Sequence, residues 1–483
     1  MKKKGKKKET PILIISLILA FILAVSNFVF AAKPDRIPPT PPSDLKAISI
    51  TDTSATITWN ISTDNVGVKS YEIYKNNSYL TSVTTNTYTV NNLVPATSYQ
   101  FYVKAKDARG NLSASSNIIT VNTPPSPVVP TGSGAKMVGY YAAWAAYSGF
   151  KPDRIDAAKL THINYAFANI SSDLKITMGY PDIDPTNFQL LNALKQANPS
   201  LKTLISVGGW TWSGKFSDVA LTDASRTVFA DSCVAFIKQY GFDGVDLDWE
   251  YPVSGGLTTN TKRAEDKHNF TLLLQKVREK LDAQGLIDKK HYLLTIAGGA
   301  GSTYTNNVEL SSLHQYLDYA TIMSYDLHGT WDAYTDLHAP LYNNTDSSPQ
   351  YKASVDSSIN AWKQASFPME KLVMGIPFYG YLYSSVPNSN NGLYQRFSGA
   401  NSINYSEIAA SYLNQPGYTR YFHSQSMVPW LYNGSTFISY EDPQSIGLKT
   451  DYIKSKGLGG AMIWELSQDP DKVLLNALYN GLQ

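Results

Sequence analysis

The chain has 483 residues and a formal net charge of +2 at pH 7. This length allows an ordinary hydrophobic core and either two to four domains or one large barrel with an accessory module. Residues 1–31 contain six lysines and one glutamate, so the rest of the chain carries a net charge of −3. This weakly acidic balance excludes charge-driven binding of nucleic acids or anionic surfaces as an expected function.

The first segment has the order of regions that is typical of a secretory signal peptide. Six lysines precede an apolar run from Ile12 to Phe30, and the small residues Ala31 and Ala32 follow. We therefore expect cleavage after Ala31, a secreted extracellular protein, and no membrane contact after cleavage. The apolar run is longer than usual, so an uncleaved membrane anchor is the alternative.

Residues 38–123 have the pattern of an all-β domain. Alternating runs such as Ala55–Trp59 and Tyr99–Val103 are separated by turn residues. Turns repeated about every eight to twelve residues predict a small β-sandwich.

This predicted sandwich resembles a fibronectin type III domain. Trp59 lies on an early strand, and Leu93, Pro95 and Tyr99 precede a late one, which makes Tyr99 the expected corner tyrosine. We expect a spacer, because a fold does not imply a function and no exposed aromatic row is visible in the sequence. A ligand-binding module is the alternative. Residues 124–135 are rich in Pro, Gly and Ser and predict an extended linker.

Beyond the linker, short apolar runs alternate with helical stretches. Eight runs are predicted as strands: Met137–Tyr141, Ile163–Ala168, Thr203–Val207, Val245–Trp249, Tyr292–Ala297, Ala320–Ser324, Leu372–Ile376 and Gly460–Trp464. Eight strand–helix alternations within residues 136–483 predict an α/β domain, a (β/α)₈ TIM barrel with an insertion. In such barrels the chemistry takes place at the C-terminal ends of the strands.

The fourth predicted strand carries three carboxylates at alternate positions. Asp246, Asp248 and Glu250 share one face and lie about 6–7 Å apart, while Val245 and Leu247 point the other way. Three ionised carboxylates so close would repel one another, so we expect at least one to keep a proton and to act as a general acid. A Ca²⁺ or Mg²⁺ site and a solvated edge strand are the alternatives. The apolar neighbours favour a buried strand.

Aromatic residues follow other predicted strands. Trp210 follows the third strand, Tyr325 follows the sixth, and Trp464 ends the eighth. An aromatic ring offers a flat apolar face to a sugar, while Tyr and Trp can still donate hydrogen bonds. An acidic centre surrounded by such rings predicts a carbohydrate site.

Three ordered motifs resemble those of bacterial, secreted chitinases of glycoside hydrolase family 18. The DGxDxDWE pattern stands at 243–250, the SxGG pattern at 206–209, and the MxYD pattern at 323–326. The similarity extends from Lys136 to the C-terminus. The stretch from about residue 381 to residue 445 falls where many family members carry a small α+β insertion between the seventh strand and the helix that follows it.

The resemblance implies substrate-assisted hydrolysis with retention. Glu250 would be the general acid and base, and the acetamido group of N-acetylglucosamine would be the nucleophile, giving an oxazolinium. Asp248 would accept the acetamido N–H, Asp246 would share a proton with Asp248, and Tyr325 would hydrogen-bond the acetamido oxygen. Further substrate contacts are expected from Asp326, Met323, Trp464, Trp331, Trp144, Trp210 and Tyr141.

The expected partners are chitin and N-acetylglucosamine oligosaccharides, and the expected state is a monomer without cofactor or metal. Two positions depart from many members: Tyr381 stands in place of an arginine, and Ala297–Ala300 lacks a proline. An endo-β-N-acetylglucosaminidase acting on N-glycans or peptidoglycan-like chains is one alternative, and a non-catalytic lectin is another. A metal-dependent esterase is disfavoured because no His–Asp ligand cluster ends a predicted strand.

Two further residues have structural interpretations. Asp243 and Gly244 form a turn signal just before the fourth strand, which favours a backbone role for Asp243. Cys233 is the single cysteine and lies in an apolar helical stripe, so we expect a small buried hydrophobic residue.

Overall fold

The structure is a computed structural model that describes residues 35–50, 54–91, 93, 97–123, 134–346 and 353–483. The predicted signal peptide and nearly all of the predicted linker lie outside the described residues. By their internal contacts, the residues divide into two compact units, Met1–Val128 and Val129–Gln483. Within the described ranges, no helix combines the length and the apolar character needed to cross a membrane.

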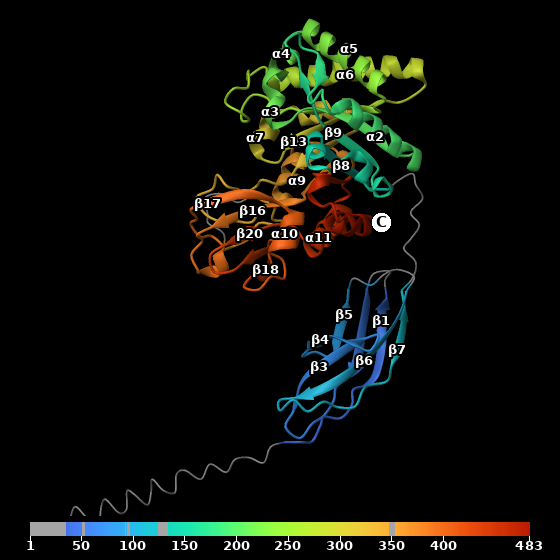
Figure 1. Cartoon of the computed structure of the whole chain (residues 1–483), viewed down its shortest axis with the longest axis vertical. Coiled ribbons are helices and arrows are strands. Elements are labelled where there is room, and N and C mark those ends of the chain that lie inside the picture. Colours follow the sequence, from blue (N-terminus) through green and yellow to red (C-terminus); the bar gives the residue numbers. More distant parts are fainter. Residues whose placement is uncertain (1–34, 51–53, 92, 94–96, 124–133, 347–352) are drawn as a thin grey trace, which may run out of the picture. The chain divides into compact units, whose positions relative to one another are not determined.

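The first unit is a sandwich of two antiparallel sheets, drawn in blue and cyan in Figure 1. One sheet has the order β1-β2-β5 and the other has the order β4-β3-β6-β7. The strands are β1 (Ser43–Ile50), β2 (Ala55–Asn60), β3 (Val68–Lys75), β4 (Ser78–Val83), β5 (Thr87–Val90), β6 (Ser98–Asp107) and β7 (Ile119–Asn122). Trp59, Tyr71 and Phe101 are buried between the sheets. The predicted all-β sandwich is confirmed.

The four-stranded sheet carries an aromatic cluster on its outer face. Tyr74 of β3 stacks on Tyr102 of β6 with ring centroids 4.7 Å apart, and Tyr79 of β4 meets Tyr74 edge-on at 5.9 Å. The Tyr79 residue is 57% exposed. Tyr74 and Tyr102 are half-buried, so this cluster exposes one ring and not the aromatic row whose absence the sequence predicted. The pairing of three strands brings these rings together, and the linear sequence does not show that pairing.

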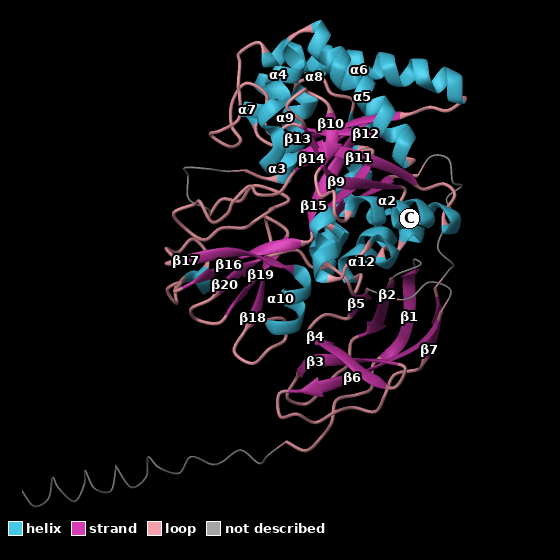
Figure 2. Cartoon of the chain, turned by 45° about the horizontal axis from the view of Figure 1, so that its top comes forward, coloured by secondary structure: helices cyan, strands magenta, loops and turns pink. Residues whose placement is uncertain are grey.

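The second unit contains a closed barrel of eight parallel strands (Figure 2). The order is β9-β11-β12-β13-β14-β15-β21-β8, and β8 also pairs with β9. The strands are β8 (Lys136–Ala142), β9 (His162–Ile170), β11 (Lys202–Gly208), β12 (Gly244–Asp248), β13 (Leu293–Gly299), β14 (Tyr319–Met323), β15 (Leu372–Pro377) and β21 (Gly460–Trp464). A short strand, β10 (Ile176–Met178), pairs antiparallel with β9. The predicted (β/α)₈ barrel is confirmed, and all eight predicted strands are present.

Helices lie outside the barrel strands in Figure 2. The α-helices are α2 (Asp184–Ala197), α3 (Gly209–Trp212), α4 (Phe216–Leu221), α5 (Asp223–Tyr240), α6 (Asp266–Asp288), α7 (Ser302–Asn307), α8 (Leu310–Leu313), α9 (Val355–Gln364), α11 (Pro443–Lys456) and α12 (Val473–Leu482). Short 3₁₀ helices are η1 (Ala143–Ser148), η2 (Pro152–Arg154), η3 (Ala157–Lys159), η4 (Ser213–Lys215), η5 (His314–Tyr316), η6 (Met369–Lys371), η7 (Asn390–Gly392) and η8 (Leu466–Gln468).

A second sheet lies between β15 and α11 in the chain and is drawn in orange in Figure 1. It is antiparallel, with the order β17-β16-β20-β19-β18. Its elements are β16 (Tyr379–Ser384), β17 (Gly399–Asn404), α10 (Tyr405–Ser411), β18 (Thr419–His423), β19 (Val428–Tyr432) and β20 (Phe437–Ser439). Tyr379 and Tyr381 of β16 extend toward the barrel cavity described below.

The alternation of β12 separates apolar from acidic side chains. Val245, Leu247 and Trp249 belong to the core between the strands and the helices. The Trp249 ring stacks on Phe216 of α4 at 5.4 Å and meets Phe270 of α6 at 5.3 Å. This outer packing fixes the register of β12, so its carboxylates point into the barrel.

Asp243 joins three elements at the N-terminal end of the barrel, away from the strand ends where chemistry is expected. Its buried carboxylate accepts hydrogen bonds from Thr203 N at 2.9 Å and Lys290 Nζ at 2.7 Å, and it pairs with Lys195 Nζ at 2.5 Å. Burial alone would raise the pKa of Asp243. The two lysines lower it by more, so the net shift is downward. These contacts support the structural role predicted for Asp243.

We expect Asp243→Asn to lower the stability of the barrel by about 1–3 kcal/mol, because it leaves two lysines without their shared carboxylate. Thermal unfolding monitored by calorimetry measures this loss. Asp173→Asn is the matched control, because Asp173 forms an exposed pair with Lys175. Equal melting temperatures for Asp243→Asn and the wild-type protein would contradict the structural role.

Candidate active site

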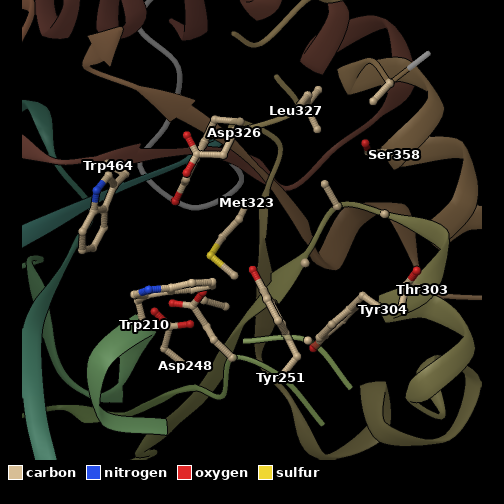
Figure 3. Close-up of a pocket in the computed structure, with 18 of the residues that line it drawn as sticks. Trp210, Asp248, Tyr251, Thr303, Tyr304, Met323, Asp326, Leu327, Ser358 and Trp464 are labelled. Atoms are coloured by element: carbon tan, nitrogen blue, oxygen red, sulfur yellow. The ribbon is translucent and has the colours of Figure 1, made fainter. Parts of the chain in front are cut away.

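A cavity of about 1100 Å³ opens at the C-terminal ends of the barrel strands. Asp248, Met323 and Trp464 are the last residues of β12, β14 and β21, and all three line it. In Figure 3 the side chains of Asp248, Tyr251 and Met323 surround one open space, with Trp464 at its side. The predicted residues that line the cavity are Asp248, Glu250, Met323, Tyr325, Asp326, Trp144, Trp210, Trp331 and Trp464.

Asp246 lies beneath this cavity and does not line it. The residue is completely buried, and its carboxylate accepts three hydroxyl groups: Tyr140 at 2.7 Å, Ser206 at 2.7 Å and Thr295 at 2.5 Å. These donors come from β8, β11 and β13. Burial raises the pKa of Asp246, and the three hydroxyl groups oppose that rise without cancelling it.

Within the part of the chain that the structure describes, the carboxyl group of Asp248 lacks a hydrogen-bond partner at one of its two oxygens. Among the described residues, its Oδ1 atom is buried and has no hydrogen-bond partner. Burial raises the pKa of Asp248 well above its ordinary value, and the charges of Glu250 and Asp246 raise it further. The protonated form is therefore favoured, and Asp248 has a free position for a hydrogen bond with a ligand.

The glycine pair of the SxGG motif allows the close packing beside Asp248. Gly208 has a φ of 104°, and a Cβ atom there would lie 2.4 Å from the Asp248 carbonyl oxygen. Ser213 follows in the next turn, and its hydroxyl accepts the Glu250 backbone N–H at 2.8 Å. Gly208 and Ser213 thus position the backbone of the acidic strand end.

Glu250 is held at the edge of the cavity with only 8% of its surface exposed. Asn260 Nδ2 donates to its carbonyl oxygen at 3.0 Å. Burial raises the pKa of Glu250 to about 7, while a hydrogen bond with Tyr251 lowers it and the charge of Asp326 raises it. A carboxyl group with this pKa can give and take a proton near neutral pH.

Asp326 has the opposite electrostatic environment. Its Oδ1 atom accepts hydrogen bonds from the hydroxyls of Tyr379 at 2.5 Å and Tyr381 at 2.7 Å, and from His338 Nε2 at 3.0 Å. Burial raises the pKa of Asp326, but His338 and the tyrosines lower it below its ordinary value. Asp326 is thus the ionised acid of the site. Tyr381, which stands in place of an arginine, is one of its donors.

The tryptophans differ in how far they are open to a ligand. Trp331 is 61% exposed, Trp210 51% and Trp144 38%. Trp464 is half-buried and stacks on Phe167, with ring centroids 5.7 Å apart. The three exposed rings are open to solvent, whereas Trp464 is held in place by its stacking on Phe167.

The prediction that Tyr141 contacts the substrate is wrong. Tyr141 belongs to the core outside the barrel, and its hydroxyl donates to the Phe150 carbonyl oxygen at 2.9 Å. Its neighbour Tyr140 lines the cavity instead. Successive strand residues point to opposite faces, so an error of one residue selects the wrong side.

Several cavity residues were not predicted. Tyr251 and Tyr304 form the side opposite Trp464 in Figure 3, and Tyr379 enters from the second sheet. Tyr140 lies on the predicted strand Met137–Tyr141, but no residue of that run marks which face points inward. Tyr304 and Tyr379 come from segments whose position relative to the cavity depends on the tertiary fold.

The fold and the site define a barrel enzyme with a carboxylate centre at the C-terminal strand ends. Residues 136–469 match the family model of glycosyl hydrolases family 18, and residues 40–122 match that of the fibronectin type III domain. The chain therefore belongs to glycosyl hydrolase family 18 and carries an N-terminal fibronectin type III domain. Both resemblances expected from the motifs are confirmed.

Relatives of known name support this family membership. Chitinase A1 of Niallia circulans is 46% identical over 403 residues, which cover 71% of this chain and 58% of that protein. The structure of chitinase ChiA74 from Bacillus thuringiensis matches with a TM-score of 0.69 and 40% identity, covering 72% of this chain and 70% of that one. The structure of a family 18 N-acetylglucosaminidase from Paenibacillus barengoltzii matches with a TM-score of 0.66 and 41% identity. The match covers 72% of this chain and 100% of that one.

We expect Glu250→Gln to raise the melting temperature of the barrel at pH 8 and to leave it unchanged at pH 4. The folded protein holds the Glu250 proton up to about pH 7, whereas the ordinary pKa is 4.5. As pH rises between these values, the unfolded chain releases a proton that the folded chain keeps, so the wild-type protein loses stability. The amide does not ionise and avoids this loss.

Calorimetry at both pH values measures the difference. Glu279→Gln is the control, because Glu279 is an exposed residue on α6 that pairs with Lys276. If Glu250→Gln melts at or below the wild-type temperature at pH 8, the raised pKa of Glu250 is refuted.

Proposed function

We propose that this protein is a secreted chitinase that hydrolyses β-1,4-linked N-acetylglucosamine chains with retention. The observation that carries the proposal is the pairing of Glu250, with a pKa of about 7, and a protonated Asp248 beside one aromatic-lined cavity. The names of Chitinase A1 and chitinase ChiA74 support the same substrate class.

The first step needs an acid and a nucleophile. Glu250 donates its proton to the leaving glycosidic oxygen, and the carbonyl oxygen of the substrate's own acetamido group attacks the anomeric carbon. This forms an oxazolinium and inverts the anomeric centre once. Water, deprotonated by Glu250, then opens the oxazolinium from the other face, so the product keeps the original configuration. Such substrate assistance needs no second enzyme carboxylate as nucleophile.

The other acids stabilise the charge that develops on the substrate. Asp248 accepts the acetamido N–H as its own proton moves toward Asp246, which increases its negative charge when the oxazolinium becomes positive. Tyr325 donates to the acetamido oxygen, and Asp326 positions that group from the opposite side. Tyr140, Ser206 and Thr295 keep Asp246 in place for this proton transfer.

Aromatic rings hold the chain on both sides of the cleaved bond. Trp464 forms the floor beneath the sugar that carries the reacting acetamido group. Trp331, Trp144 and Trp210 receive flanking sugars, which agrees with their larger exposure.

The remaining parts of the chain serve this activity. Residues 1–31 direct secretion, residues 38–123 form the fibronectin type III domain, and residues 124–135 link it to a monomeric catalytic domain. Within residues 136–483, the insertion at about 381–445 would lie beside one side of the cavity. Tyr379, just before this range, lines the cavity, and Tyr381, its first residue, donates a hydrogen bond to the cavity residue Asp326, which supports this placement.

The first test follows products from an N-acetylglucosamine hexamer. We expect the wild-type protein to release new reducing ends that are initially β-anomers by NMR. Glu250→Gln should lower kcat by at least about 10²-fold, because general acid catalysis contributes at least that much. Chitobiose as the main product supports a chitinase, whereas single sugars would support the activity named for the Paenibacillus barengoltzii relative. New α-anomers would rule out the retaining route.

The second test removes the nucleophile from the substrate. We expect fully deacetylated chitosan and cellulose to resist hydrolysis at enzyme concentrations that cleave chitin oligomers, because neither polymer has an acetamido group. A high-mannose glycopeptide tests the endo-β-N-acetylglucosaminidase alternative in the same assay. Cleavage of cellulose at a comparable rate would refute substrate assistance.

A further inference from the structure

Three carboxylates from distant parts of the chain meet at one end of the fibronectin type III domain. Asp35 precedes β1, Asp64 lies between β2 and β3, and Asp107 is the last residue of β6. Each contributes one oxygen atom, and these three oxygens lie within 4.8 Å of one another. Carboxylates that converge in this way repel one another unless a cation or a proton balances them.

No basic side chain of the described residues balances this cluster. The ion pairs described in the first unit join Lys46 to Asp44 and Lys106 to Glu72, and neither includes the three acids.

Two oxygens of the cluster are buried without a partner. Asp35 Oδ2 and Asp64 Oδ1 expose almost no surface and accept no hydrogen bond in the described part of the chain. The other oxygen of each residue is occupied: Asp35 Oδ1 accepts Asn65 Nδ2 at 3.1 Å, and Asp64 Oδ2 accepts the N–H groups of Val66 and Gly67 at 2.9 Å. A buried carboxylate oxygen without a partner is costly, and a bound cation would remove that cost.

Hydrogen bonds from outside the cluster fix its deepest ligand. Asp107 is 1% exposed, and its carboxylate accepts Asn111 Nδ2 at 2.7 Å and the N–H groups of Asn111 at 2.9 Å and Arg109 at 2.8 Å. Asn111 Nδ2 also donates to the Asp35 carbonyl oxygen at 3.2 Å. The carboxylates are therefore held together by neighbouring amides, although their charges repel.

We propose that Asp35, Asp64 and Asp107 bind one Ca²⁺ ion. Carboxylate oxygens are the ligands that Ca²⁺ prefers, and its flexible coordination by six to eight oxygens suits an asymmetric set completed by water. Mg²⁺ demands a near-ideal octahedron and fits this set less well. The ion joins the segment before β1 to two turns of the sandwich, so it stabilises the folded domain by mass action.

The direct test is calorimetric titration of the full-length protein with CaCl₂ after treatment with EDTA. We expect one Ca²⁺ per chain and at least about tenfold weaker binding of Mg²⁺. Asp64→Asn should weaken Ca²⁺ binding at least about tenfold, since it removes one charge from the ligand set. Asp44→Asn is the matched control, because Asp44 is an exposed acid of the same domain that pairs with Lys46 and lies outside the cluster.

A second readout is the unfolding temperature of the domain within the full-length protein. Ca²⁺ should raise the transition of the sandwich in the wild-type and Asp44→Asn proteins but not in Asp64→Asn, and the barrel transition should not move. The titration extends to roughly 10 mM CaCl₂, which exceeds the dissociation constants of the weakest extracellular Ca²⁺ modules. The absence of binding heat from the wild-type protein over this range would overturn the proposal. Equal weakening by Asp44→Asn would also overturn it.

Discussion

The burial of three carboxylates on one strand is the constraint on which the rest of the barrel depends. Asp246, Asp248 and Glu250 occupy successive inward positions of β12 and the residues after it, and all are nearly inaccessible to solvent. Ionised acids are unfavourable in such a place, so the protein either surrounds them with donors or leaves them protonated. The first solution applies to Asp246, which has three hydroxyl donors, and the second to Asp248 and Glu250.

Asp326 shows that the same cavity can also favour a charged acid. Two tyrosine hydroxyls and one histidine surround it, and its pKa falls while that of Asp248, in the same cavity, rises. A cavity that keeps one carboxylate charged and another neutral has an oriented electrostatic field. The dipole of a polar substrate group such as an acetamido can align with this field. This contrast is the electrostatic basis of the proposed mechanism.

The sequence predicted the barrel well because its signals are local. The eight apolar runs each carry their own strand pattern, and the alternation within β12 places its acids inward without tertiary information. Tyr304 and Tyr379 could not be found in this way, because tertiary packing brings them to the cavity. The acid cluster of the sandwich was missed for the same reason. Tyr141 was a different error: alternation separates it from Tyr140, but β8 carries no acid that would mark which of its faces points inward.

The contacts of Asp246 have a consequence for how the barrel assembles. Its three hydroxyl donors are 106, 40 and 49 residues away in the sequence. The most distant donor belongs to β8, which also pairs with the last strand, β21. All three donors belong to strands that precede β14, yet the barrel around Asp246 closes only where β21 pairs with both β8 and β15. Full burial of the β12 acids therefore requires the C-terminal end of the chain.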